Sequence, residues 1–344
     1  MSFVPQLRAS YRIVDHRERQ VAPHSVAFNV GANRLYCGFE DAIEVFDIHR
    51  PGEGTRLRTT PSKKSRDGLK GIVSALAFAP DVSSDVYAAG SFSPSSPSSS
   101  NIAIFSEANG EVPIMFVGAE DEPAGGGVGC GVRASVSQLM FSPARPFLLF
   151  ASFRRVDDIY CWDLRGDVSR PVEVFSTSST LPIRNLTNQR LRFDLDIGGN
   201  WLAVGDEGGG VSVFDLAAPS STPAGGKEQE SAPRSSPMSN PRTTPTLRFD
   251  AHGDAVGSVA FHPLRPLLLS VSGSRHFDQA SGVSSDSSTS DSESDLEGRT
   301  ECPPSVGTFA VKRPRNKLQP AALDTTIKLW GFDGANSGGQ ETGE

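Results

Sequence analysis

The sequence lacks the features on which several functional classes depend. Its 344 residues contain no run of about 18 apolar residues, which excludes a membrane-spanning helix. The first residues, MSFVPQLRASYRIVDHRER, contain no apolar signal core, so secretion is not expected. The six histidines are scattered and show no H-E-x-x-H spacing, and no paired cysteine motif occurs. The sequence therefore predicts no metal site.

Catalytic and nucleotide-binding motifs are missing as well. No G-x-S-x-G elbow and no phosphate-binding loop is present. Residues 129–134 match a loose dinucleotide pattern, but they follow no clear strand and lead into another strand rather than a helix. We therefore expect no enzymatic activity, no cofactor and no small-molecule substrate.

Cysteine and positive charge are both scarce. The four cysteines, Cys37, Cys130, Cys161 and Cys302, lie far apart, which is typical of buried, reduced thiols in an intracellular protein. The net charge of -7 argues against a broad basic face that holds nucleic acid by phosphate contacts alone. Much of the acid lies in residues 284–297, so a local basic patch elsewhere is compatible with this charge.

Turn residues and a repeat are what the chain has in abundance. It contains 34 glycines and 25 prolines, which indicate many turns and long loops. A short apolar run closed by phenylalanine recurs, and each copy is followed by a turn and a second apolar run. A third run then ends in an aromatic residue, at Phe46, Phe105, Trp162, Phe214 and Trp330. Three short strands per repeat predict an all-β propeller with five visible blades.

The repeats divide the chain into regions. Residues 1–22 form an N-terminal segment with one expected strand at residues 7–13, and residues 23–333 form the propeller. Two insertions within it, residues 217–245 and 274–323, and the tail at 334–344 are expected to be disordered. The blades are expected at residues 24–48, 72–105, 136–164, 189–216 and 256–332.

Short sequence motifs within the repeats resemble those of known families. A histidine before the first strand and an aromatic residue followed by an acid at the end of the third resemble WD repeats, as does Asp324-Thr325-Thr326-Ile327-Lys328-Leu329-Trp330. A longer series of motifs resembles the telomerase Cajal body protein family and occurs in the same order as in that family. The motifs include Leu7-Arg8-Ala9-Ser10-Tyr11-Arg12, His24-Ser25-Val26-Ala27-Phe28-Asn29, Cys161-Trp162-Asp163-Leu164-Arg165, Thr187-Asn188-Gln189-Arg190 and Phe261-His262-Pro263-Leu264-Arg265-Pro266.

The resemblance implies a function and leaves two architectures open. Members of the family are non-catalytic scaffolds that bind a loop motif of small Cajal body RNAs and of telomerase RNA, together with RNA-protein particle proteins, in the nucleus. They carry blades ahead of the point where this sequence begins, so the chain resembles a fragment of a seven-bladed propeller. The second architecture is a closed five-bladed ring in which residues 7–13 supply the outer strand of the fifth blade. The second function is a protein-only adaptor in pre-mRNA splicing or another nuclear complex, and a cytoplasmic pool is the second location.

The candidate RNA face follows from blade geometry. Loops that enter the first strand and loops between the second and third strands open on one face, and unpaired RNA bases stack on aromatic or arginine planes. Other roles stand beside this one: His24 and His252 as hydrogen-bonding partners within their blades, Arg190 as a partner of Asp194 or Asp206, and Arg154 with Arg155 as a solvated pair. Asp158, Asp206 and Asp324 are expected to form turns, and Trp162 and Trp330 to lie in the core. The candidate RNA-binding residues are Arg133, Arg154, Arg155, Arg190, Arg192, His252 and Arg275.

A short basic run lies in the second insertion. Its cationic residues are Lys312, Arg313, Arg315 and Lys317. Runs of this kind serve nuclear import, so these four residues are candidates for that role.

Overall fold

The computed structural model describes residues 7–14, 17–62, 64–65, 67–92, 101–118, 134–177, 189–217, 242–274, 276–277 and 320–332. Their regular secondary structure consists of strands, which form antiparallel sheets with one parallel pairing. In this part of the chain, no helix is long and apolar enough to cross a membrane. The predicted all-β class is confirmed.

The first two sheets each contain four strands paired in chain order. Three of the strands in each sheet are those predicted from the repeat, and the fourth is a short outer strand. The first sheet consists of β1 (Ser25–Phe28), β2 (Arg34–Phe39), β3 (Ala42–Asp47) and β4 (Thr55–Arg58). The second consists of β5 (Val73–Phe78), β6 (Val86–Ser91), β7 (Ile102–Ser106) and β8 (Met115–Val117).

The third and fourth sheets repeat this order with one addition. They consist of β9 (Val136–Phe141), β10 (Leu148–Phe153), β11 (Asp158–Asp163) and β12 (Glu173–Ser176), and of β13 (Phe193–Leu195), β14 (Trp201–Gly205), β15 (Gly210–Asp215) and β17 (Leu247–Asp250). The addition is β16 (Arg242–Thr243), which pairs in parallel with β12. The prediction that the insertion is disordered as far as residue 245 is therefore wrong at its end, because Arg242 and Thr243 form a paired strand.

The fifth sheet contains three strands among the described residues. They are β18 (Val256–Phe261), β19 (Leu267–Ser272) and β22 (Ile327–Gly331). A two-stranded ladder of β20 (His276–Phe277) and β21 (Pro320–Ala321) lies at the base of the second insertion. Disorder was expected from residue 274 to 323, so that prediction is wrong for the residues at both ends, which pair with each other.

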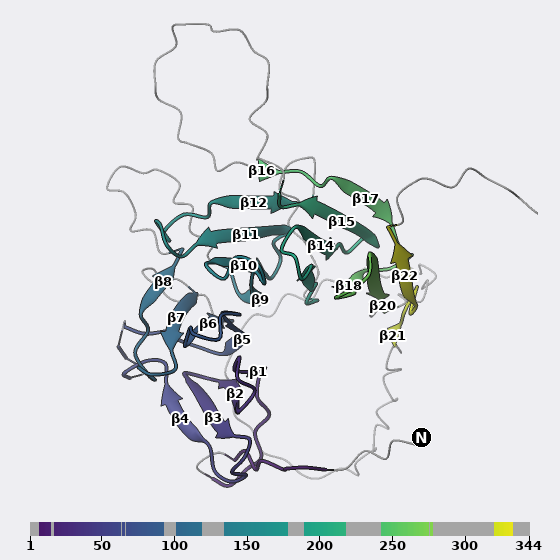
Figure 1. The fold of residues 1–344 in the computed structure, drawn as a ribbon. Helices are drawn as coiled ribbons and strands as arrows, with labels where there is room; N and C mark the ends of the chain where they lie inside the picture. Colours follow the sequence, from purple (N-terminus) through teal and green to yellow (C-terminus); the bar gives the residue numbers. More distant parts are fainter. Residues whose placement is uncertain are drawn as a thin grey trace, which may run out of the picture.

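The five sheets follow one another around an open arc, with β22 at one end and the first sheet at the other (Figure 1). The core lies between the faces of neighbouring sheets, where each pair encloses a cluster of buried apolar side chains. Trp162 is buried between the second and third sheets, and Trp330 packs against the cluster between the fourth and fifth. Trp162 thus has the core position that the sequence predicts, whereas Trp330 is partly buried against its cluster.

In the fourth and fifth sheets, an aromatic contact connects the third strand to the outer strand of the preceding sheet. Phe175 of β12 meets Phe214 of β15 with ring centroids 5.4 Å apart, and Phe249 of β17 meets Trp330 of β22 at 4.8 Å. Each ring pair is roughly edge to face, an arrangement that aromatic quadrupoles favour. Phe214 and Trp330, which mark the third run of their repeats, therefore join neighbouring blades.

The N-terminal segment makes the corresponding contact with the first sheet. The ring of Tyr11 lies 5.3 Å from that of Phe46, and its hydroxyl donates to the carbonyl of Ile48 at 3.2 Å. Ile13 packs on the same cluster, beside Cys37 and Phe39. The strand predicted at residues 7–13 is not formed, and Tyr11 and Ile13 contact the first sheet instead of the fifth, which contradicts the closed five-bladed alternative.

The two described cysteines are buried, reduced thiols. Burial, with a smaller contribution from Glu44, raises the pKa of Cys37 to about 11. Burial also raises the pKa of Cys161 far above its usual value. Both thiols are therefore protonated at neutral pH, as the sequence predicts, while Cys130 and Cys302 lie outside the described residues.

Candidate nucleic-acid interface

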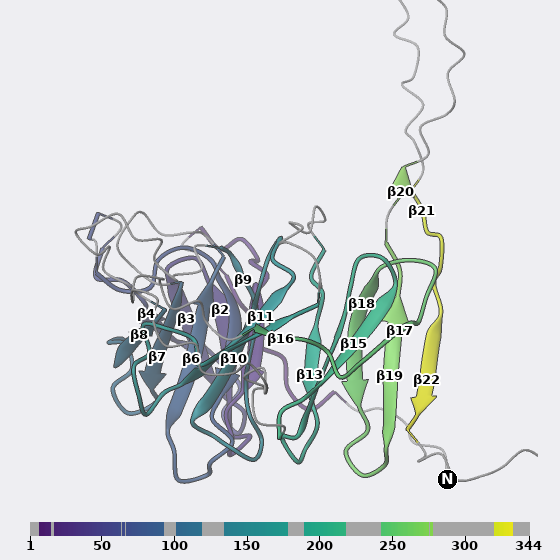
Figure 2. The ribbon, with the colours of Figure 1, turned by 90° about the horizontal axis from the view of Figure 1, so that it is seen from above.

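The predicted RNA face is formed by loops from one end of the sheets. It includes the β10–β11 connection at residues 154–157, the approach to β13 at residues 189–192 and the approach to β18 at residues 251–255. In Figure 2 the β20–β21 ladder extends from the same end of the fifth sheet, and the β18–β19 connection lies at the opposite end. Antiparallel pairing places these loops together, because every first strand runs away from this face.

Gly209 brings the β14–β15 turn into close contact with the loop that connects β17 to β18. Its carbonyl accepts hydrogen bonds from the amides of Ala251 and His252 at 3.0 and 2.9 Å. Its φ is +93°, and a Cβ there would lie 2.1 Å from the carbonyl oxygen of His252. Only glycine satisfies both the backbone conformation and this approach.

Arg154 lies over an aromatic ring that belongs to the neighbouring sheet. Its guanidinium carbon is 4.3 Å from the centroid of Phe92, which follows β6. The backbone amide of Arg154 donates to the carbonyl of Ser135 at 2.8 Å, and the Ser135 hydroxyl donates to the carbonyl of Phe92. The Nε atom of Arg154 has no hydrogen-bond partner among the described residues. The two sheets thus hold a stacked cation and ring in place.

Other arginines raise the positive charge around this pair. Burial, and then repulsion from Arg190 and Arg155, lowers the pKa of Arg154. Arg155 lies at the tip of the turn with a φ of +59°, and Arg190 and Arg192 are exposed. The Arg192 amide donates to the carbonyl of Gly257 at 3.0 Å, which connects the fourth and fifth sheets. We call the surface formed by Phe92, Arg154, Arg155, Arg190 and Arg192 the arginine face.

The carboxylates suggested as partners of Arg190 are engaged elsewhere. Asp206 pairs with Arg248 at 2.9 Å, and Asp194 accepts a hydrogen bond from the Phe261 amide at 2.7 Å. Burial is the main reason why the pKa of Asp194 is raised. Among the described residues, Arg190 is not paired with a carboxylate and has Arg154 as its charged neighbour.

Two arginines that pair with carboxylates near this face were not predicted from the sequence. Arg248 of β17 neutralises Asp206, and Arg242 of β16 lies 3.3 Å from Asp158. Both carboxylates, with Arg155, line a small cavity of about 30 Å³ between the third and fourth sheets. The alternation in β17 was a signal for Arg248, whereas Arg242 lies at the end of a low-complexity insertion that gives none.

The expected turn roles of three aspartates divide in the structure. Asp206 accepts hydrogen bonds from the amides of Gly208 and Gly210 at 2.9 and 2.8 Å, and Asp324 accepts one from the Thr326 amide at 2.9 Å. These two form turns as predicted. Asp158 instead lies in β11 and serves as the partner of Arg242.

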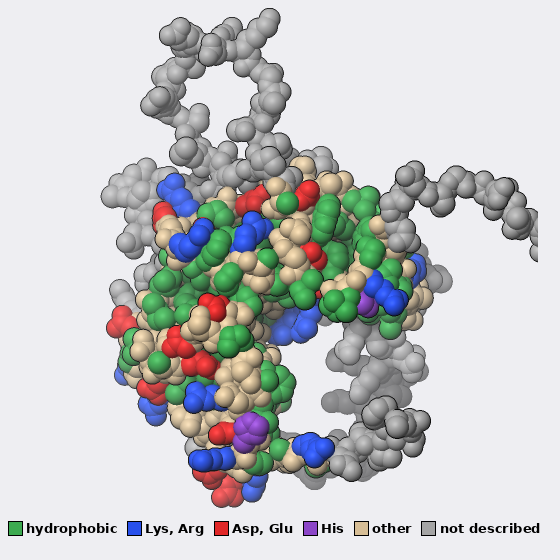
Figure 3. Space-filling model, viewed as in Figure 1, with side chains coloured by type: hydrophobic (Ala, Val, Ile, Leu, Met, Phe, Trp, Pro, Cys, Tyr) green, Lys and Arg blue, Asp and Glu red, His purple; other side chains and the backbone are tan. Residues whose placement is uncertain are grey.

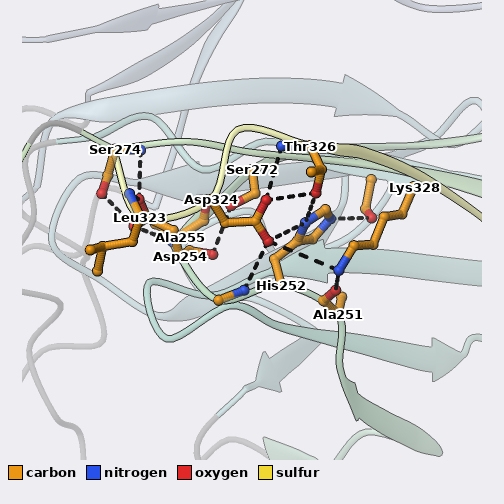
Figure 4. Close-up of polar contacts among 12 residues, drawn as sticks. Ala251, His252, Asp254, Ala255, Ser272, Ser274, Leu323, Asp324, Thr326 and Lys328 are labelled. Atoms are coloured by element: carbon orange, nitrogen blue, oxygen red, sulfur yellow. Dashed lines mark hydrogen bonds and ion pairs between the residues drawn. The ribbon is translucent and has the colours of Figure 1, made fainter. Parts of the chain in front are cut away.

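The prediction that His252 binds RNA is wrong. Its side chain is 0% exposed, and Figure 4 shows both ring nitrogens engaged within the fifth blade. Nε2 lies 2.7 Å from the Ser270 hydroxyl oxygen, which also accepts the indole N–H of Trp330 at 2.8 Å. Nδ1 lies 3.2 Å from the Thr326 hydroxyl and 3.3 Å from Asp324. His252 therefore joins the loop before β18 to β19 and β22. His24, at the corresponding place in the first blade, is exposed.

Some predicted residues cannot be placed on the face. Arg133 and Arg275 lie outside the described residues, as do the four nuclear-import candidates Lys312, Arg313, Arg315 and Lys317. Of the seven candidates for RNA contact, Arg154, Arg155 and Arg190 lie close enough to interact, and Arg192 is exposed in the same loop as Arg190. In the described part of the chain, no cluster of histidine, cysteine or acidic residues is arranged to hold a metal ion.

Two carboxylates of the fifth blade, Asp254 and Asp324, have pKa values lowered by their hydrogen bonds. Burial raises the pKa of Asp254, but hydrogen bonds from Ser274, His276 and backbone amides outweigh it and hold the pKa well below its usual range. Hydrogen bonds from Thr326, and then from the Gly253 amide, do the same to the pKa of Asp324. Because both folded-state pKa values are depressed, their stabilisation is complete above about pH 4 and is lost as the pH falls below it.

We therefore expect the free energy of unfolding to decrease as the pH falls from about 4 toward 2. Urea unfolding at a series of pH values measures this decrease. In an Asp254→Asn variant the decrease should be smaller, because one of the two carboxylates no longer titrates. A decrease of the same size in the variant and the parent chain would show that Asp254 is not a source of the acid sensitivity.

The repeated sheets, the loop face and the network around His252 define a WD-repeat protein of the β-propeller type. Comparison with known proteins leads to a particular family. Telomerase Cajal body protein 1 of Bos taurus is 32% identical over 276 residues, which are 80% of this chain and 42% of that protein. The protein of the same name from Homo sapiens is 31% identical over 80% of this chain and 41% of its own length. The chain therefore resembles the telomerase Cajal body protein family over four fifths of its length, as its sequence predicts.

More distant similarities complete the comparison. The telomerase Cajal body protein 1 homolog of Drosophila melanogaster is 24% identical over 284 residues. The crystal structure of Raptor from Chaetomium thermophilum matches 75% of this chain and 18% of its own, with a TM-score of 0.46 and 17% identity. No family model matches the chain. The fold assignment rests on the strand pairing, and the chain spans less than half the length of the curated relatives.

Proposed function

We propose that the chain is a non-catalytic scaffold that binds unpaired segments of small Cajal body RNAs or of telomerase RNA through the arginine face. The stacked pair of Arg154 and Phe92, with Arg190 beside it, is the observation that supports this proposal. The names of the relatives, at about 31% identity, favour this class of RNA. In this proposal other proteins of the RNA-protein particle bind elsewhere on the scaffold.

The geometry favours bases that are not paired. Single-stranded bases stack on aromatic rings and on guanidinium planes, and each stacked base contributes about 1–3 kcal/mol. Arg154 and Phe92 supply such a plane where two sheets meet, and Arg155, Arg190 and Arg192 supply charge for neighbouring phosphates. A duplex hides its base faces and would meet only the charges.

The overall negative charge limits how much of the surface takes part. With a net charge of -7, long-range attraction to RNA is weak, so binding must depend on the local group of arginines. Arg242 and Arg248 support this group because they neutralise Asp158 and Asp206, which would otherwise repel phosphate. We therefore expect a modest salt dependence, corresponding to a few phosphate contacts.

A comparison of two RNAs tests the proposal. The purified chain is titrated with a fluorescent hairpin that displays an unpaired loop, and with a duplex of the same length and base composition. We expect the hairpin to bind about tenfold more tightly than the duplex, because only its loop bases reach the ring and the guanidinium plane. Equal affinity for the two RNAs, or no binding of either, would favour the protein-only adaptor of splicing or another nuclear complex.

The nucleus is the proposed location. The relatives are named for the Cajal body, and the basic run with Lys312, Arg313, Arg315 and Lys317 is of a kind that serves nuclear import. A fluorescent fusion with all four residues changed to alanine should shift from the nucleus to the cytoplasm. A fusion that stays nuclear would assign import to another segment or to a bound partner.

A further inference from the structure

A groove lies between the fourth and fifth sheets, at the end opposite the arginine face. It is bounded by the β13–β14 connection, by the β18–β19 connection, by the start of β17 and by Phe332 after β22. Its volume is about 550 Å³, which is within the range of sites that bind ligands. Figure 2 shows the β18–β19 connection at the end of the sheet away from the β20–β21 ladder.

The groove is lined mainly by apolar side chains that are open to solvent. Leu264 is 86% exposed, Ile197 is 65% exposed, and Trp201 and Leu247 are 38% and 42% exposed. On the face shown in Figure 3, hydrophobic side chains gather over β15, β17 and β22. Single exposed apolar residues are ordinary, but several around one groove typically mark an interaction site.

The polar and charged side chains of the groove differ in how far a ligand could bind them. The carboxylate of Asp196 accepts hydrogen bonds from the amides of Asn200 and Trp201 at 2.6 and 2.7 Å, so the turn occupies it. The Nδ1 atom of His262 accepts the amides of Leu264 and Arg265 at 3.0 and 3.1 Å. Arg265 is exposed at the rim, next to Leu264. A ligand would therefore meet apolar surface with one cation beside it.

We propose that this groove binds a short acidic peptide of a partner protein, with apolar side chains in the groove and a carboxylate on Arg265. The chemistry of the groove points to this ligand. A small-molecule site needs several converging polar groups. Here the Thr246 hydroxyl already accepts the Asp215 amide at 3.2 Å, and the peptide groups named above engage Asp196 and His262. RNA would find one cation and no stacked pair.

The position of the groove gives the proposal a functional consequence. The arginine face and the groove lie at opposite ends of the same sheets, so one chain can hold RNA and a peptide at the same time. The proposal does not rest on RNA binding, because a peptide site on this face is equally useful to a protein-only adaptor. Loss of peptide binding and loss of RNA binding are therefore separate results.

Selection from random peptides displayed on phage tests the proposal on the whole chain. We expect the enriched peptides to combine apolar residues with aspartate or glutamate. A synthetic peptide of the enriched sequence is then titrated against variants by fluorescence polarisation. Leu264→Ser and Arg265→Glu should each weaken binding about tenfold or more, because one removes an apolar contact and the other repels the carboxylate.

Val82→Ser is the matched control. Val82 is 85% exposed and lies in the corresponding first-to-second-strand connection of the second sheet, so its loss should leave peptide affinity unchanged. Equal binding by all three variants, or enrichment of basic peptides, would overturn the proposal. Binding seen only after removal of residues 333–344 would also overturn it, because the tail would then be the occupant of the groove. Self-association that Leu264→Ser abolishes would overturn it as well, because the occupant would then be a second copy of the chain.

Discussion

The His252→Ala variant is expected to lower the free energy of unfolding by about 2–4 kcal/mol. The substitution removes a fully buried ring and leaves the Ser270 hydroxyl with Trp330 as its one remaining side-chain partner. It also separates the loop before β18 from Thr326 and Asp324. Urea unfolding followed by tryptophan fluorescence measures the change, since Trp330 is part of the network.

His24→Ala is the control for this experiment. His24 precedes the first strand of its sheet as His252 does, but its side chain is exposed, so we expect a change below about 0.5 kcal/mol. RNA affinity, measured at a temperature where both variants are folded, should match that of the parent chain. If His252→Ala kept full stability and lost RNA binding, the assignment of His252 to the blade interior would be wrong.

The double variant Arg154→Ala, Arg190→Ala is expected to bind loop RNA roughly tenfold or more weakly. It removes the guanidinium that lies 4.3 Å from the Phe92 centroid and the cation beside it. The salt dependence of binding should also become shallower, by about one phosphate contact for each arginine that meets a phosphate. Titration of the fluorescent hairpin at several salt concentrations measures both quantities.

Arg165→Ala provides a matched comparison. Its guanidinium carbon lies 3.3 Å from the centroid of Phe147 and it pairs with Asp163 at 2.7 Å, but at the opposite end of the third sheet. The substitution removes one guanidinium that lies over an aromatic ring, and it leaves the arginine face unchanged. We expect unchanged RNA affinity. A loss in Arg165→Ala about half as large, on a logarithmic scale, as that in the double variant would mean that net charge, and not the arginine face, controls binding.

The blades were predictable because each repeat combines several signals. Phe28, Phe78 and Phe141 close first strands as the sequence suggests, and the runs that follow them form the second strands. Turns confirm the boundaries, since Asp206 accepts amides of its own turn. The outer strands gave a weaker signal, because segments such as residues 55–58 are short and mostly polar.

The candidate site was predictable only in part, because burial and pairing are not visible in a sequence. A histidine before a first strand fits RNA contact and blade packing equally well. The 0% exposure of the His252 side chain assigns it to packing within the blade. The stacking partner of Arg154 lies 62 residues earlier in the chain, at Phe92, and no local pattern connects them. The alternation of residues 7–13 likewise suggests a strand. The ring contact of Tyr11 with Phe46 shows instead that this segment lies against the first sheet.

In the proposed function the arginine face holds unpaired RNA of small nuclear particles. Crosslinking and sequencing of the RNAs bound to the tagged chain in its own cells tests it most directly, with the Arg154→Ala, Arg190→Ala variant beside it. The account predicts enrichment of small guide RNAs or telomerase RNA, with crosslinks in unpaired loops that the variant loses. Recovery of no RNA above background, or the same RNAs at the same level with the variant, would contradict it.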